Sequence, residues 1–150
     1  MSAITTVYDI LITRIAAVLT GHYRLSNPYK LEENAETFLR IGYGLAIGDA
    51  VNTLKPMTGC LFTQRNFILS ISRRYAATES NAVAKATTEK QIMEDLFLLI
   101  NDFHQNTTLT NGNRVVKFES DSGINYVQGE TDKFMYTSAV ISIEYFETLT

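Results

Sequence analysis

Apolar and polar side chains alternate along residues 61–75, which is the period of a strand with one buried face. The two sets are Leu61, Phe67, Leu69, Ile71 and Tyr75 at one parity, and Gln64, Asn66, Ser70, Ser72 and Arg74 at the other. Residues 135–146 alternate in the same way, with Ala139, Ile141, Ile143 and Tyr145 opposed to Ser138, Ser142 and Glu144. Both patterns predict long strands that bury their apolar side.

Two other segments carry apolar residues at helical spacing and predict amphipathic helices. The first covers residues 5–19, and Gly21 is placed to end it. The second covers residues 88–104, where Thr88 followed by Gln91 is typical of a helix start. Its apolar stripe consists of Ile92, Met93, Leu96, Phe97, Leu99, Ile100 and Phe103. We expect this whole stripe to be core, and the carboxylates of Glu94 and Asp95, which lie off it, to be solvated.

Glycine and proline mark the region between the first helix and the first long strand. Gly42, Gly44 and Gly48 punctuate an apolar run over residues 38–47, which predicts a strand with a bulge or a close backbone approach. Pro28 forbids a continuous helix or a central strand in residues 22–36. We interpret this segment as an exposed excursion.

The remaining segments are shorter. Residues 49–59 predict a loop, and residues 76–87 a loop or a first helical turn. Residues 114–119 predict a strand, and residues 124–128 a short strand or an extended loop. The order is helix, two strands, helix, then two or three strands. This order favours a single domain over residues 1–150, of class α+β, in which a mixed, mostly antiparallel β-sheet is packed on one face by two α-helices.

Charge and composition narrow the classes of function. The 150 residues carry a formal net charge of −3, whereas proteins that bind nucleic acid with their whole surface are usually basic. Cys60 is the one cysteine, which excludes an internal disulfide and a cysteine-based zinc site. No apolar run approaches the roughly 20 residues of a membrane span, and the N-terminus lacks the pattern of a signal peptide. We therefore expect a soluble domain made in a cytoplasm, with no membrane partner.

The charge is unevenly spread along the chain. Residues 1–118 carry +2 and residues 119–150 carry −5. A polarised subunit suits head-to-tail association, in which one surface meets a different surface of its neighbour. The alternative is a chance distribution in a small sample.

No catalytic or cofactor motif is found. The run from Gly42 to Gly48 departs from a dinucleotide fingerprint, because its last spacing is one residue too long and no helix follows. His22 and His104 have no carboxylate at metal-ligand spacing, and Cys60 is expected to be a small buried hydrophobe. We therefore expect no enzyme, metal or cofactor. A small ligand-binding domain or an enzyme that uses the glycine-rich strand and Cys60 is the alternative.

The whole arrangement resembles the tail-terminator proteins of long-tailed bacteriophages. The features that carry the resemblance are the N-terminal helix, the segment Phe-Leu-Arg-Ile-Gly-Tyr-Gly-Leu at residues 38–45, the alternating strand at 60–75, the helix at 88–104, and the final strand Ala-Val-Ile-Ser-Ile-Glu-Tyr-Phe at 139–146. The resemblance implies a ring, hexameric in that family, at the head-proximal end of the tail tube. Such a ring stops polymerisation of the tube and offers a surface for joining to the head.

The same resemblance implies the partners and the location. The partners are further copies of the chain, the tail-tube protein and the head–tail connector protein, and DNA passes through the lumen of the ring without sequence-specific binding. The location is the tail of the virion, after assembly in the host cytoplasm. Neck and head-completion connector proteins share parts of the pattern and remain an alternative.

Two segments carry more apolar residues than a solvated loop requires. They cover residues 54–60 and 124–135, and aromatic residues and Met are enriched in interface cores. We expect these segments to contact neighbouring subunits or the tube, and an arginine such as Arg73 or Arg74 to meet the acidic residues of the second segment across a subunit boundary. The alternative is that both loops fold back on their own sheet. The predicted interface residues are Leu54, Met57, Arg73, Arg74, Tyr126, Val127, Glu130, Asp132 and Phe134.

Overall fold

The computed structural model describes most of the chain as two helices and six strands. The described residues are 3–25, 28, 41–55, 60–75, 82–109, 113–120, 123–128 and 133–148. Their elements are α1 (Ala3–Val18), β1 (Tyr23–Arg24), β2 (Ile41–Lys55), β3 (Cys60–Tyr75), α2 (Ala82–Gln105), β4 (Arg114–Ser120), β5 (Asn125–Gln128) and β6 (Lys133–Thr148). Neither helix has the combination of length and apolarity needed to cross a membrane.

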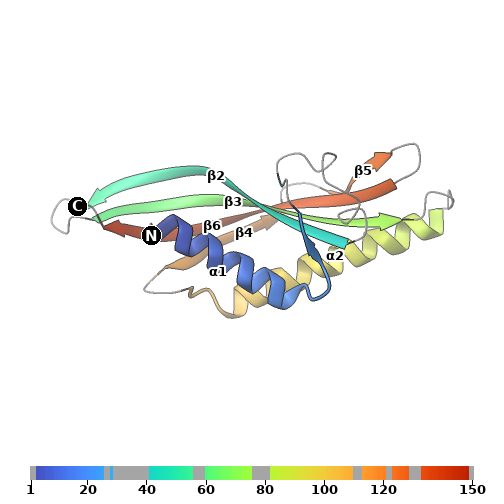
Figure 1. Cartoon of the computed structure of the whole chain (residues 1–150), viewed down its shortest axis with the longest axis horizontal. Coiled ribbons are helices and arrows are strands. Elements are labelled where there is room, and N and C mark those ends of the chain that lie inside the picture. Colours follow the sequence, from blue (N-terminus) through green and yellow to red (C-terminus); the bar gives the residue numbers. More distant parts are fainter. Residues whose placement is uncertain are drawn as a thin grey trace.

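The strands form one sheet, in the order β1-β2-β3-β6-β4, with β5 also paired to β6. Among the strand pairs in the described part of the chain, β1 and β2 run parallel and the others are antiparallel. Both helices lie on the same side of the sheet, and the N- and C-termini lie at the same end of an elongated molecule (Figure 1). The predicted fold class, α+β with two helices on one face of a mixed, mostly antiparallel sheet, is confirmed.

Strands β3 and β6 form the spine of the sheet. Their register is continuous from Cys60 opposite Thr148 to Tyr75 opposite Lys133. Sixteen residues at about 3.4 Å each give a ribbon roughly 50 Å long. The long alternating patterns of the sequence are therefore long strands, as predicted, and the structure places them at the centre of the sheet.

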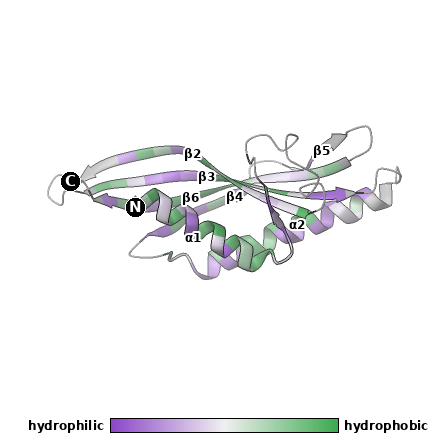
Figure 2. Ribbon diagram, in the orientation of Figure 1, coloured by the Kyte–Doolittle hydropathy of each residue, from purple (hydrophilic) through white to green (hydrophobic). Residues whose placement is uncertain are grey.

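The core lies between the helices and the apolar side of these strands. Val7, Leu11 and Ile15 of α1 are fully buried there. The sheet contributes buried residues of one parity: Phe67, Leu69 and Ile71 of β3, and Ala139, Ile141, Ile143 and Tyr145 of β6. Figure 2 shows hydrophobic stretches on both helices where the two helices run beside each other under the sheet.

Strand β2 extends further than predicted. Residues 49–55 continue the pairing with β3 after a register shift between Ile47 and Ala50, so this part of the predicted loop is strand. The bulge is held from β3, because Nη1 of Arg65 donates a 2.9 Å hydrogen bond to the carbonyl oxygen of Gly48. A bulge moves the following side chains to the opposite parity, which hides the strand from a period-two search.

Helix α2 differs from its prediction in start and in phase. It begins at Ala82, six residues before Thr88, in an alanine-rich stretch of high helix propensity. Its buried stripe consists of Ile92, Leu96, Leu99 and Phe103. Met93 and Phe97, which we expected in the core, are 44% and 65% exposed. Asp95, which we expected in solvent, is 6% exposed.

Gly42 and Gly44 of β2 allow Leu25 and Pro28 to pack closely on the face of the sheet opposite the helices. A Cβ atom at Gly42 would stand 2.7 Å from Cδ2 of Leu25, and one at Gly44 would stand 2.9 Å from Cβ of Pro28. Leu25 is buried by this contact. The glycines thus serve close packing, which is one of the two interpretations predicted for this run.

Candidate interaction surfaces

The structure brings several predicted interface residues together at one end of the sheet. Arg74 lies opposite Phe134 of β6, and Phe134 lies opposite Val127 of β5. In the neighbouring row, Arg73 lies opposite Met135, which lies opposite Tyr126. Phe134 is buried within the subunit. Arg74 is exposed.

The other predicted interface residues are not part of this group. Leu54 lies in β2, opposite Leu61, near the other end of β3. Met57, Glu130 and Asp132 lie outside the described residues. The interface that these residues were predicted to form therefore stays a prediction.

Arg73 has a partner within its own chain. Its Nε and Nη2 atoms donate hydrogen bonds of 2.7 and 3.0 Å to the two carboxylate oxygens of Asp95 on α2. His22, in the turn after α1, places Nε2 3.2 Å from Oδ2 of the same carboxylate. Three elements distant in sequence therefore meet at one buried carboxylate.

The electrostatics of this cluster explain how a carboxylate is kept in the protein interior. Burial alone raises the pKa of Asp95, but the hydrogen bonds from His22 and Arg73 and the charges of both groups outweigh burial and hold the pKa below its ordinary value. Asp95 is thus ionised, and both of its carboxylate oxygens accept hydrogen bonds. An acid kept in this state suits a structural ion pair better than proton transfer, for which a pKa near the working pH is needed.

The outward face of α2 carries an exposed apolar pair. Met93 and Phe97 lie one turn apart, and both are exposed. Lys90 and Glu94 flank them on the same face and are also exposed. We call Lys90, Met93, Glu94 and Phe97 the helix patch. Met and aromatic side chains are enriched in the cores of protein interfaces, so this pair is a candidate contact with another molecule.

The face of the sheet opposite the helices carries a second apolar group. Ile68, which is 39% exposed, lies opposite Val140, and Val140 lies opposite Glu119 of β4. Lys117, two residues before Glu119 on the same face, forms a 2.8 Å ion pair with it. We call Ile68, Val140, Glu119 and Lys117 the sheet patch. Further along this face, the rings of Phe62 and Phe146 contact each other at a centroid distance of 5.1 Å.

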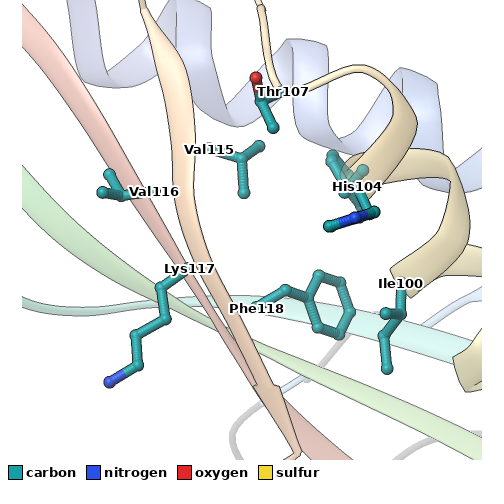
Figure 3. Close-up of a pocket in the computed structure, with 8 residues that line it drawn as sticks. Ile100, His104, Thr107, Val115, Val116, Lys117 and Phe118 are labelled. Carbon is teal, nitrogen blue, oxygen red and sulfur yellow. The ribbon is translucent and has the colours of Figure 1, made fainter.

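A shallow depression separates the end of α2 from β4. Its volume is about 130 Å³. Val115 and Phe118 point from β4 toward Ile100 and His104 of α2, whereas Lys117 points away from the helix (Figure 3). Sites that enclose a small organic ligand usually measure roughly 300–1,000 Å³. The depression is of the size of one apolar side chain.

Sequence reasoning missed the Asp95 cluster and both patches. His22 lies 73 positions before Asp95, and Arg73 lies 22 positions before it, so no local spacing indicates the contact. The apolar stripe of α2 did contain a signal for the helix patch. Seven apolar residues over three turns form a stripe broader than one face of a sheet covers, so some of them are left for another contact.

No protein-family model matches the chain, and no curated protein matches it either.

Proposed function

We propose that the chain is a ring-forming structural subunit that caps the head-proximal end of a bacteriophage tail tube. In this role it stops growth of the tube and presents a docking surface to the head connector. Its partners are further copies of itself, the tail-tube protein and the connector protein.

The observation that carries the proposal is the order and layering of the elements. A first helix, a two-residue strand, a long antiparallel hairpin, an amphipathic helix and a final group of strands follow one another, and both helices lie on one face of the sheet (Figure 1). The resemblance to tail terminators rests on this order. Fold alone does not fix a function, so this support is by analogy.

The two patches support the structural part of the proposal. They lie on opposite sides of the two-layer fold, so that they cannot cover each other within one subunit. A subunit with two different contact surfaces associates head to tail, and such contacts close into a ring when the rotation per subunit allows it.

The proposal is tested by the assembly state of the purified protein. Size-exclusion chromatography with light scattering, alone and with isolated tail tubes, should reveal a ring of several subunits, and electron microscopy should place it at one end of the tubes. A protein that stays monomeric with tubes present and never occupies a tube end contradicts the proposal. Recovery with head-only particles instead of tails indicates a neck protein.

The ligand-binding alternative has its own test. A nucleotide at 100 times its dissociation constant stabilises the folded state by about 2.7 kcal/mol, which a thermal-shift screen detects. A clear shift with any nucleotide would favour that alternative over a purely structural subunit.

A further inference from the structure

We propose that the helix patch of one subunit packs on the sheet patch of the next subunit. This contact rests on the proposed function, because it is the head-to-tail interface from which the ring is built. Phe97 is its central anchor, seated on Ile68 and Val140 of the neighbouring copy.

Phe97 has the properties of an interface anchor. It is a large aromatic residue, 65% exposed at the middle of the solvent face of a 24-residue helix, and Met93 lies one turn before it. Aromatic residues and Met are enriched in interface cores, and a few central aromatic residues carry most of the binding free energy. The helix is held in place from behind by the Arg73–Asp95 ion pair, so the anchor is presented on a fixed element.

The charges on the two patches are complementary. Lys90 and Glu94 lie one helical turn apart, about 6 Å along the axis. Glu119 and Lys117 lie two residues apart on β4, about 6.8 Å along the strand. When Phe97 lies on Ile68 and Val140, Lys90 can therefore face Glu119 while Glu94 faces Lys117. The ion pair between Lys117 and Glu119 within one chain is exposed, with both side chains 57% accessible, so little free energy opposes its rearrangement.

A second copy fits these observations better than a symmetric contact between two α2 helices. A symmetric contact would bring two helix patches together and close a dimer, which leaves the sheet patch uncovered. The contact between helix patch and sheet patch covers both surfaces at once. It also leaves one free patch of each kind on any open chain of subunits, so that assembly continues until the ring closes.

The experiment exchanges charges between the two patches. The first variant carries Lys90→Glu with Glu94→Lys, the second carries Lys117→Glu with Glu119→Lys, and the third carries all four substitutions. Each keeps the net charge of the chain. Light scattering over a range of concentrations measures association. We expect either exchange alone to weaken association about tenfold or more, and the combined variant to restore it to within about threefold of the wild type.

Two substitutions at exposed apolar positions of α2 supply the anchor test and its control. Phe97→Asp should abolish association while the subunit stays folded, as judged by denaturant unfolding. Leu98 is 50% exposed on the same helix but points about 100° away from Phe97. Leu98→Asp should therefore associate like the wild type.

The outcomes separate this contact from the proposed function. If the wild type forms a ring that caps tubes, and Phe97→Asp and both charge exchanges associate equally well, the proposed contact is wrong but the proposed function stands. A combined variant that associates no better than the single exchanges also overturns the contact. If the wild type and the variants associate as predicted but the wild type never caps a tube, the proposed function is wrong and the contact stands. A wild type that is monomeric at every concentration and with tubes overturns both.

Discussion

The guanidinium of Arg73 on β3 and the carboxylate of Asp95 on α2 form a two-bonded ion pair across the core of the subunit, at 2.7 and 3.0 Å. Asp95 is buried, and Arg73 is largely shielded from solvent. The pair fixes the helix to the central strand at the point where α2 carries its exposed anchor on the opposite side. The stability of the fold and the presentation of the helix patch are therefore linked through one carboxylate.

Replacement of this carboxylate should be costly at neutral pH. Asp95→Asn leaves the Arg73 charge without its partner, and removal of one member of a buried pair costs about 3 kcal/mol or more of the free energy of unfolding. Urea denaturation at pH 7 measures the loss. Asp9→Asn, at an exposed carboxylate of α1 outside both patches, is the matched control and should change the stability by less than about 0.5 kcal/mol. Equal effects of the two substitutions would contradict the importance of the ion pair.

The same pair predicts a pH dependence. The pKa of Asp95 is lower in the folded protein than in the unfolded chain, where it is close to the ordinary value of about 3.9. The stabilisation is thus fully present above the unfolded pKa and is lost as the pH falls through the folded pKa. The difference in stability between the wild type and Asp95→Asn should therefore be present at about pH 5 and shrink below pH 4. A difference that stays constant down to pH 2 would show that the charge of Asp95 is not its source.

Two neighbouring residues of α2 should differ sharply in their effect on folding. Leu96 is buried in the core and Phe97 is exposed. Leu96→Ala should reduce the free energy of unfolding by about 2–5 kcal/mol, because it leaves a cavity. Phe97→Ala should change it by less than about 0.5 kcal/mol when both proteins are measured at dilutions where the subunits are dissociated, because the contact proposed for Phe97 forms only between subunits. A large loss for Phe97→Ala would place that ring in the core after all, as the sequence pattern predicted.

Period-two and helical patterns predict those elements whose burial is one-sided. The strands β3 and β6 were found with nearly correct ends because Phe67, Leu69, Ile141 and Ile143 all face one core. The end of β2 was missed because the bulge after Ile47 reverses the parity. The start of α2 was missed because the residues from Ala82 to Thr87 have helix propensity but no apolar stripe.

The candidate surfaces depend on contacts that no local pattern contains. Hydropathy places charged residues in solvent, and Asp95 is an exception only because Arg73 and His22 converge on it from other elements. In the same way, the apolar stripe of α2 indicates that Met93 and Phe97 lie in a contact. Whether that contact is the core or an interface depends on the width of the sheet beneath the helix, which no local pattern contains.

A carboxylate from the last strand caps the first helix. The backbone N–H groups of Ala3 and Ile4 donate hydrogen bonds of 3.1 and 3.3 Å to the two carboxylate oxygens of Glu147, and α1 has no acidic residue in its own first turn. We expect Glu147→Gln to lower the free energy of unfolding by about 0.5–2 kcal/mol, since a negative charge at a helix N-terminus is favourable. Asp49→Asn, at an exposed carboxylate of β2 outside both patches, is the control and should cost less than about 0.5 kcal/mol in the same denaturation experiment. Equal stability of Glu147→Gln and the wild type would contradict the capping role.

The glycines of β2 allow a test between nucleotide binding and close packing. Their spacing was compared with a nucleotide-binding motif, whereas in the structure Gly42 and Gly44 lie against Leu25 and Pro28. A methyl group at Gly44 would meet the stiff ring of Pro28 at 2.9 Å, and one at Gly42 would meet the end of the flexible Leu25 side chain at 2.7 Å. Gly44→Ala should therefore destabilise the protein by about 1–3 kcal/mol, as overpacking usually does, and Gly42→Ala by less, since Leu25 can move aside. Gly123→Ala is the control, because a Cβ atom there meets no atom within 4 Å. Thermal unfolding with and without nucleotides measures both properties. If the glycines serve packing, Gly44→Ala lowers the melting temperature equally with and without nucleotide, and a loss confined to the nucleotide-containing sample would assign them to ligand binding.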